Sequence, residues 1–263
     1  MKCSKIINII EELAPPSLAL SWDNVGLIIG NADDNISTIL LALDINDQVI
    51  DEAIDINAQL IITHHPPIFK GIKNITTDSA TGRYLIKLLQ NKISVYTSHT
   101  NLDICNRGVN DTLFKILQLK DKVNLNTYEN GHSLGRIGNT NKSYTLLEFT
   151  KFVSNKLNVS IVRYVGDPNS IITKVALCGG SASDQEMFNL ALQNGAHVYL
   201  TGDIRYHEAF NAIGMGLNLI DATHFATENY ALLDVKTYIE NKVNEDIKIF
   251  ISNADLQPFK GIN

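Results

Sequence analysis

The sequence has few cysteines. Cys3, Cys105 and Cys178 are the three in 263 residues, they lie far apart, and no C-x-x-C pair occurs. This spacing excludes a disulfide framework and a zinc site built from thiolates. The pattern fits a reducing compartment, where Cys178, within VALCGG, is expected to be a small core residue.

The sequence also lacks a long uninterrupted apolar run. Asn8, Glu11 and Glu12 interrupt the N-terminal stretch MKCSKIINIIEELAPPS, which therefore predicts an amphipathic helix ending before Pro15 and not a signal peptide. No other stretch is long and apolar enough to span a bilayer. We therefore expect a cytoplasmic protein without a membrane partner.

Basic residues are too few for a protein that binds nucleic acid through its phosphates. Lys and Arg number 22 against 28 Asp and Glu, which gives a formal net charge of −6. Phosphate recognition requires dense positive charge on one face, so nucleic acid is not an expected partner. A small anionic substrate is compatible with this charge, since bound divalent cations can reverse the sign of a local site.

The composition and its pattern predict an α/β fold. Apolar residues make up 44% of the chain and charged residues 19%, the balance of a folded globular protein. β-rich runs alternate with helical stretches: STILLALDI, NDQVIDEAIDINA, QLIITHH, SATGRYLIKLLQNK and ISVYTSHT. This order predicts mostly parallel sheets with helical crossovers, and the continuous apolar runs indicate strands covered on both faces.

The second half repeats this order, in ITKVALCGG, SASDQEMFNLALQNGA, HVYLTGD, RYHEAFNAIGMG and LNLIDATH. The repeat predicts two related α/β lobes that face each other, with Asn46 and Ser183 as N-caps of corresponding helices. Residues 120–140 are rich in Asn, Gly and charge, which is typical of a loop or hairpin. We place the boundary there, giving lobes of residues 1–127 and 128–263, with a C-terminal element that can pack on the first lobe.

Two adjacent histidines end the apolar run LIITHHPPIF. The two prolines that follow stiffen the backbone and end the strand. In an open parallel sheet, ligands bind beyond the carboxyl ends of the strands, where His64, His65, His99 and His224 are all expected. Two imidazoles diverging from a rigid strand end can reach two neighbouring metal ions, one each.

Carboxylates follow two of these histidines at a regular spacing. His99 precedes Asp103 by four residues, and His224 precedes Glu228 by four. If a helix begins at Phe225, His224 and Glu228 lie on one side of it, about a turn apart, so that both can contact one metal centre. Histidine and carboxylate ligands without Cys suit Zn²⁺, Mn²⁺, Fe²⁺, Co²⁺ or Ni²⁺. The residue types alone are also compatible with solvated or backbone-bonded histidines in a nucleotide-binding, doubly wound fold.

Five separated segments occur in a characteristic order between residues 21 and 258: SWDNVGLIIG, ITHHPPIF, SHTNLDICNRGVNDTL, TGDIRYHEA and DATHFATENYA. With these segments the sequence resembles the GTP cyclohydrolase 1 type 2 homologues, a family of hexameric dinuclear-metal proteins. The resemblance implies two divalent metal ions per chain, held by His64, His65, Asp103, His224 and Glu228, with Glu228 contacting both ions. It also implies a toroidal homohexamer with the metal sites facing an internal cavity, and within each chain we expect the dinuclear site in the cleft between the two lobes.

Other residues are expected near this site. His99 is expected to orient a metal ligand by a hydrogen bond or to act in catalysis, and a buried histidine bonded to the backbone is the alternative. His207, with Asp203, is expected to supply a general acid or base, and an ordinary surface histidine is the alternative. Trp22 and the two residues after it are expected to shape the wall of the site or a subunit contact.

Together these observations predict a metal-dependent hydrolase. Its nucleophile would be a hydroxide that bridges the two metal ions, and its substrate would be small, nucleotides included. The family name implies opening of the guanine ring of GTP, although the chain contains no P-loop to hold a triphosphate. Two alternatives stay open: a dinuclear-metal phosphoesterase and a non-catalytic metal-binding ring scaffold.

Overall fold

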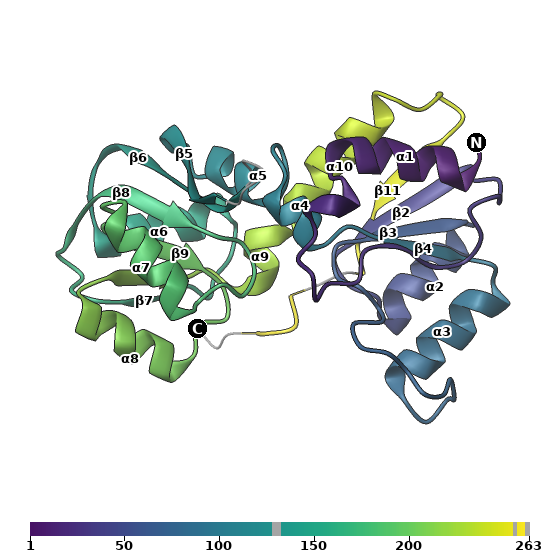
Figure 1. Cartoon of the computed structure of the whole chain (residues 1–263), viewed down its shortest axis with the longest axis horizontal. Helices are drawn as coiled ribbons and strands as arrows, with labels where there is room; N and C mark the ends of the chain where they lie inside the picture. Colours follow the sequence, from purple (N-terminus) through teal and green to yellow (C-terminus); the bar gives the residue numbers. More distant parts are fainter. Residues whose placement is uncertain (128–132, 255–256, 261–263) are drawn as a thin grey trace. The chain divides into compact units, whose positions relative to one another are not determined.

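The computed structural model describes residues 1–127, 133–254 and 257–260. The chain divides into two compact units (Figure 1). Unit 1 comprises Met1–Gly108 and Leu232–Leu256, and unit 2 comprises Val109–Ala231 and Gln257–Asn263. Residue 127, where the sequence analysis places the boundary between the lobes, lies within unit 2, at the end of a strand.

One mostly parallel sheet forms the centre of unit 1. Within the described residues it has five strands in the order β1-β4-β3-β2-β11. The four strands from β4 to β11 run parallel, and β1 pairs antiparallel with β4 at one edge. The strands are β1 (Gly26–Ile29), β2 (Thr38–Ala42), β3 (Leu60–Thr63), β4 (Ser94–Thr97) and β11 (Lys248–Ile251).

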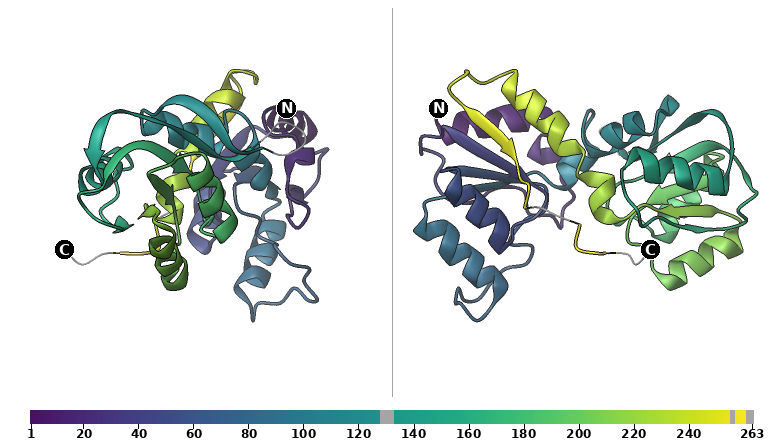
Figure 2. Two further views of the ribbon diagram at one scale, coloured as in Figure 1. Left: turned by 60° about the vertical axis from the view of Figure 1, so that its left-hand side comes forward. Right: turned by 180° about the vertical axis from the view of Figure 1, so that it is seen from behind.

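Helices cover both faces of this sheet, so its strands are apolar on both sides, as predicted (Figures 1 and 2). α2 and α3 pack on one face, where Leu40, Ile61 and Val95 meet Ile50 and Leu88. α1 and α10 lie on the other face. The helices of this unit are α1 (Cys3–Leu13), the 3-10 turn η1 (Pro16–Leu18), α2 (Asp47–Asp55), α3 (Ala80–Gln90), α4 (Thr100–Ile104) and α10 (Ala231–Glu240).

Unit 2 has a mixed sheet. In its described part, six strands follow the order β5-β6-β8-β9-β10-β7. β8, β9 and β10 run parallel, as predicted from their crossover helices, whereas β5, β6 and β7 join antiparallel. The hairpin expected in residues 120–140 is the pair β5 and β6. The strands are β5 (Lys120–Thr127), β6 (Ser133–Thr145), β7 (Arg163–Val165), β8 (Ile171–Leu177), β9 (Val198–Thr201) and β10 (Asn218–Asp221).

Successive side chains of the parallel strands enter two separate cores. Val175 and Leu177 of β8 pack with α5, α6 and α9, while Ala176 between them packs with α7 and α8. In β9, Leu200 likewise packs in the first of these cores and Tyr199 in the second. The helices of this unit are α5 (Val109–Ile116), α6 (Leu146–Lys156), α7 (Gln185–Gln193), α8 (Tyr206–Met215) and α9 (His224–Glu228). The two cores therefore confirm the predicted α/β class.

The predicted helix caps agree with the structure in one case and differ in the other. The Asn46 side chain accepts a hydrogen bond from the Val49 N–H and caps α2, as expected. Ser183 was expected to cap α7, and this prediction is wrong because Asp184 accepts from the Met187 N–H instead. The Ser183 hydroxyl donates to Glu208, at the start of α8. Both residues can cap a helix, so the local sequence allowed either choice.

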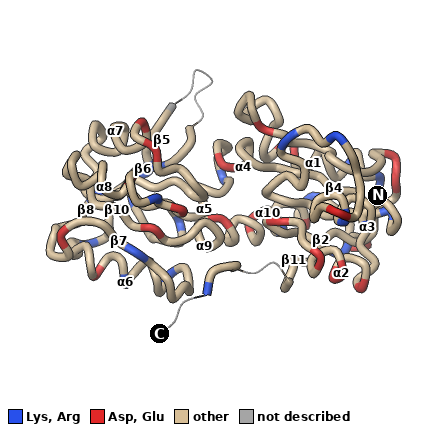
Figure 3. Tube along the Cα trace, turned by 90° about the horizontal axis from the view of Figure 1, so that it is seen from below, with Lys and Arg blue, Asp and Glu red and all other residues tan. Residues whose placement is uncertain are grey.

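Charged residues of both signs are distributed over each unit (Figure 3). Among the described residues, no helix combines the length and the apolar composition that crossing a bilayer requires.

Candidate metal centre

The parallel strands of unit 1 end in a row of functional side chains. Asp44 follows β2, His64 and His65 follow β3, and His99 follows β4. Because β2, β3 and β4 are neighbours in the sheet, their carboxyl ends meet at one edge. Each of the three histidines offers one ring nitrogen that lies within 4.8 Å of the other two. This cluster could hold a metal ion.

The two adjacent histidines occupy a continuation of the sheet. Their backbone N–H groups donate to the carbonyl oxygens of Ala42 and Leu43. Pairing with β2 and the residue that follows it therefore extends two residues beyond β3. The two prolines were expected to end the strand, and these backbone hydrogen bonds reach His65, the residue directly before Pro66. The imidazole rings of His64 and His65 nevertheless lie together, with ring centroids 4.9 Å apart.

The Nδ1 atom of each histidine in the cluster is held by an oxygen acceptor. His64 Nδ1 lies 2.9 Å from the Ser98 carbonyl oxygen. His65 Nδ1 lies 3.0 Å from Asp44 Oδ1, and His99 Nδ1 lies 2.9 Å from Asp23 Oδ1. These oxygens can only accept, so Nδ1 carries the proton, and in the neutral imidazole Nε2 keeps its lone pair. That tautomer is the one that can bind a metal ion through Nε2.

Asp23 is held as a carboxylate. Burial raises its pKa, but hydrogen bonds from His99 and from the hydroxyl and N–H of Thr100 outweigh burial, and the net pKa lies well below the ordinary value of an aspartic acid. The ionised carboxylate fixes the orientation of the His99 ring. Asp23 was expected to shape the wall of the site or a subunit contact, and the hydrogen bond to His99 gives it a more specific role.

Asp103 joins the cluster from α4, the short helix after β4. The side chain is buried, and its Oδ1 lies 3.5 Å from His64 Nε2. A buried carboxylate that faces an imidazole lone pair needs a cation between the two groups, either a proton or a metal ion. His64 and Asp103 therefore form one pair of candidate ligands within unit 1.

In unit 2, His224 and Glu228 form a second pair on α9. His224 Nε2 lies 3.1 Å from Glu228 Oε2, and His224 Nδ1 lies 2.8 Å from Asp203 Oδ2. Glu228 is buried, whereas His224 is partly exposed. The pair repeats the arrangement in unit 1, because a carboxylate faces Nε2 while another acceptor holds Nδ1.

Glycines at two strand ends leave room for this second pair. Gly180 follows β8 with φ +70°, and a Cβ atom there would lie 2.2 Å from Glu228 Oε1. Gly202 follows β9, and its Cβ would lie 2.6 Å from the backbone nitrogen of His224. The Gly180 N–H also donates to Thr227 of α9. Side chains at either glycine would displace the helix that carries both ligands.

Thr223 connects β10 to α9 in a left-handed conformation. Its φ is +67°, which is unusual for a β-branched residue and costs roughly 1–3 kcal/mol. The N–H of Thr223 donates to Asp221 Oδ1, and its hydroxyl accepts from Gln257. These bonds hold the turn that positions His224.

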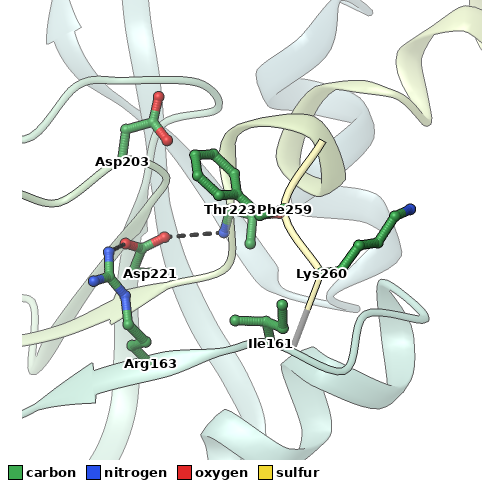
Figure 4. A pocket seen from close by; sticks show the side chains of 7 residues that line it. All are labelled: Ile161, Arg163, Asp203, Asp221, Thr223, Phe259 and Lys260. Atoms are coloured by element: carbon green, nitrogen blue, oxygen red, sulfur yellow. Dashed lines mark hydrogen bonds and ion pairs between the residues drawn. The ribbon is translucent and has the colours of Figure 1, made fainter. Parts of the chain in front are cut away.

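A cavity of about 340 Å³ opens at this turn (Figure 4). Figure 4 shows the Arg163 guanidinium directed at Asp221, its ion-pair partner. Asp203, which holds His224, also lines the cavity. The complete lining is Ile161, Arg163, Asp203, Asp221, Thr223, Phe259 and Lys260. The cavity thus combines an aromatic ring with charged groups of both signs.

His207 lies elsewhere on unit 2. It is exposed on α8, with its ring edge-on to Tyr206 at a centroid distance of 5.3 Å. Among the described residues, the groups of ligand atoms close enough to share an ion do not include His207. Asp203, its expected companion, contacts His224 instead.

Some residues of the site were not predicted from the sequence. Asp44 and Gly180 were not expected to have any role at the site. The available signal was position, because each follows the end of a parallel strand, where ligand-binding residues gather. Position alone does not identify which histidine or carboxylate each residue contacts.

The chain is similar to known proteins over its whole length. The profile of the family described as Duf34/NIF3 (NGG1p interacting factor 3) matches residues 1–258. A Clostridium perfringens protein named GTP cyclohydrolase 1 type 2 homolog is 39% identical over 264 residues, covering 100% of both chains. A Bacillus cereus protein related to NIF3 has a crystal structure with a TM-score of 0.94 and 26% identity, covering 100% of this chain and 99% of that one.

A second solved structure, of a hypothetical protein from Staphylococcus aureus, has a TM-score of 0.93 and 32% identity, with the same coverage. These likenesses extend over both units and include the segments that carry the histidines and carboxylates described above. The chain belongs to the Duf34/NIF3 family.

Proposed function

We propose that the chain holds two divalent metal ions with His64, His65 and Asp103 of unit 1 and His224 and Glu228 of unit 2. With these ions it would act as a metal-dependent hydrolase. His99 would orient its neighbours in the cluster and contact the substrate. The relatives named GTP cyclohydrolase 1 type 2 homolog suggest a nucleotide as substrate class.

One observation carries this proposal: the Nδ1 atoms of His64, His65 and His224 are all held by acceptors, a carbonyl in the first case and carboxylates in the other two. Histidines that bind metals through one ring nitrogen almost always donate the other N–H in this way. The hydrogen bond fixes both the tautomer and the direction of the ring. Histidines that serve only in packing have no need for the same arrangement three times over.

The donor set also fits a divalent ion. Imidazole nitrogens and carboxylate oxygens suit zinc, manganese, iron, cobalt and nickel, and Asp103 and Glu228 supply the negative charge that two cations require. Both carboxylates are buried, at 7% and 3% exposure. Burying them without a cation would cost several kcal/mol each.

Such ions would supply Lewis-acid polarisation and would lower the pKa of a coordinated water towards neutrality. The protein's own groups would then position the reactants. The cavity beside His224 would offer Lys260 to an anionic substrate, together with Arg163 at its ion pair with Asp221. A nucleotide combines an anionic group with a ring, which this mixed lining accommodates.

Metal analysis of two variants tests the ligand assignment. If Glu228 contacts both ions, Glu228→Gln loses both, whereas His64→Ala loses mainly one. Elemental analysis of the purified variants gives the stoichiometry, and the exposed His207→Ala serves as the control that keeps both ions. Full metal retention in both ligand variants would exclude these assignments.

Product analysis tests the reaction. Purified protein is assayed on GTP and on simple phosphoesters, with metal replete and metal stripped. Metal-dependent release of formate from GTP supports ring opening. Release of phosphate alone would identify a phosphoesterase, and stoichiometric metal without turnover on either substrate class would identify a binding protein. Light scattering on the same sample tests the homohexamer that the resemblance implies.

A further inference from the structure

Two aromatic side chains of unit 1 are unusually open. Trp22 is 55% exposed and Phe69 is 48% exposed. They come from different loops, yet their rings are in contact, with centroids 5.6 Å apart and planes inclined by 45°. Single exposed apolar residues are ordinary on protein surfaces. Two large exposed rings in contact form one continuous aromatic surface instead.

Polar contacts fix the two loops that carry these rings. The Asn24 side-chain amide donates to the Ile68 carbonyl oxygen at 2.6 Å, which joins one loop to the other. Asp23, next to Trp22, accepts from the N–H groups of Asn24 and Thr100. The aromatic surface is therefore preorganised, and a ligand that binds it pays little for ordering the loops.

The aromatic surface borders the histidine cluster. The His99 ring lies edge-on to both aromatic rings, with centroid distances of 6.1 Å to Trp22 and 6.3 Å to Phe69. The His99 ring also lies 5.2 Å from that of His64 and 5.5 Å from that of His65, again between ring centroids. A planar ring stacked on the aromatic surface would thus place its substituents next to the candidate metal ligands.

We propose that Trp22 and Phe69 form a stacking platform for a planar heteroaromatic ring, such as a nucleobase, of the substrate. Every ring has a π-face, so stacking selects for planarity before it selects among bases. That the bound ring belongs to a substrate which is then hydrolysed rests on the proposed function. The binding itself involves only unit 1 and is tested separately from turnover.

The chain offers a direct probe, because Trp22 is its only tryptophan. Tryptophan emission of the full-length protein as purified is titrated with guanosine, adenosine and uridine, and with ribose 5-phosphate, which lacks a base. We expect saturable quenching by nucleosides and none by ribose 5-phosphate. Free N-acetyltryptophanamide corrects for absorption by the ligands. No quenching by any of the three nucleosides would overturn the proposal.

Variants separate stacking from general effects. Phe69→Leu keeps Trp22 as the probe and should weaken nucleoside binding about tenfold, the effect of losing one stacked ring. Trp22→Ala, measured by equilibrium dialysis, should weaken binding at least as much. Tyr206→Leu removes another exposed aromatic side chain, on unit 2, and should leave binding unchanged. Equal affinity in all three variants would refute the platform.

Two further outcomes distinguish this proposal from its alternatives. If Trp22 emission changes only when the protein is diluted and its molar mass falls, the rings form a contact between copies of the chain and the proposal is wrong. If nucleosides bind through the platform but no turnover occurs, the proposed hydrolase function fails while the platform stands. Formate or phosphate release that is unaffected by Phe69→Leu and Trp22→Ala would contradict the platform and leave the hydrolase intact.

Discussion

The backbone conformation of Gly180 and its contact with Glu228 both disfavour a larger residue at this position. Its φ of +70° is unfavourable for other residues, and a Cβ atom would lie 2.2 Å from Glu228 Oε1. Gly195 has a similar φ of +75°, but the nearest atom to its Cβ would be the flexible Lys174 ammonium at 3.9 Å. Substituting each glycine in turn therefore distinguishes the effect of backbone strain, which both positions share, from displacement of Glu228, which occurs only at Gly180.

We expect Gly180→Ala to lose metal and Gly195→Ala to keep it. Each substitution should cost about 1 kcal/mol of stability or more from the positive φ, so thermal unfolding shifts in both variants. Only Gly180→Ala also pushes the Glu228 carboxylate aside. Metal content measured by elemental analysis distinguishes the two. Equal metal content in both variants would show that Glu228 is not held in the place that metal binding needs.

At the scale of elements, a buried ion pair joins α5 to β6. Arg136 is fully buried, its Nε lies 2.5 Å from Asp111 Oδ1, and its Nη1 donates to the carbonyls of Ser133 and Gly135. Lys122 contacts the other oxygen of Asp111 from the surface, with its side chain 41% exposed. One carboxylate thus has a buried partner and an exposed one.

We predict very different costs for removing these two partners. Arg136→Met should destabilise unit 2 by roughly 3–5 kcal/mol, because the Asp111 charge loses its buried partner. Lys122→Met should cost about 1 kcal/mol or less, as exposed ion pairs do. Urea unfolding followed by circular dichroism gives both values. Similar midpoints for the two variants would indicate that Asp111 is adequately solvated without Arg136.

Glu52 ties α2 to the chain after β11. Partial burial raises its pKa, but hydrogen bonds from Ser252 and from the N–H groups of Asn253 and Ala254 outweigh burial, so the net pKa is lowered. A lowered folded-state pKa means that the ionised form stabilises unit 1. This contribution is complete above the pKa of an unfolded glutamate and is lost as the pH falls through the folded-state value.

We therefore expect Glu52→Gln to remove a pH-dependent part of the stability. At neutral pH the variant should be less stable than the natural chain by about 1–3 kcal/mol, and this difference should shrink as the pH falls below about 4. Urea midpoints measured across this pH range test the expectation. The exposed Glu245→Gln is the matched control and should show no such difference. A difference that is constant with pH would exclude the carboxylate as its source.

At the scale of the whole molecule, the chain completes unit 1 only after it has built most of unit 2. Leu232–Leu256 belong to unit 1, where β11 pairs with β2 and α10 buries Leu232, Val235 and Ile239. Three such side chains contribute roughly 5–9 kcal/mol, comparable to the entire stability of a domain. Without β11, β2 would also become an exposed edge strand.

Truncation after residue 231 should therefore unfold unit 1 and spare unit 2. Hydrogen exchange followed by mass spectrometry should show loss of protection in β2 and β3 and unchanged protection in β8 and β9. Removal of residues 257–263 alone is the control and should leave β2 and β3 protected. Retained protection of β2 in the longer truncation would mean that the first 108 residues fold without their C-terminal partner elements.

Local patterns in the sequence determined much of what was predicted correctly. The apolar runs of β2, β3, β8 and β9, and the cap at Asn46, depend on neighbours within a few residues. The position of the histidines at strand ends follows from the same runs. The antiparallel β7 and the cap by Asp184 were missed, because several local choices were equally acceptable there.

Only the tertiary structure decided which acceptor holds each histidine. His65 and Asp44 are separated by 21 residues along the chain, His99 and Asp23 by 76, and Gly180 meets Glu228 only through the packing of α9. Side-chain periodicity reaches over one helix or strand, so it can place a histidine at a strand end. Its hydrogen-bond partner depends on which strands become neighbours in the sheet, and that order is set by packing between distant segments.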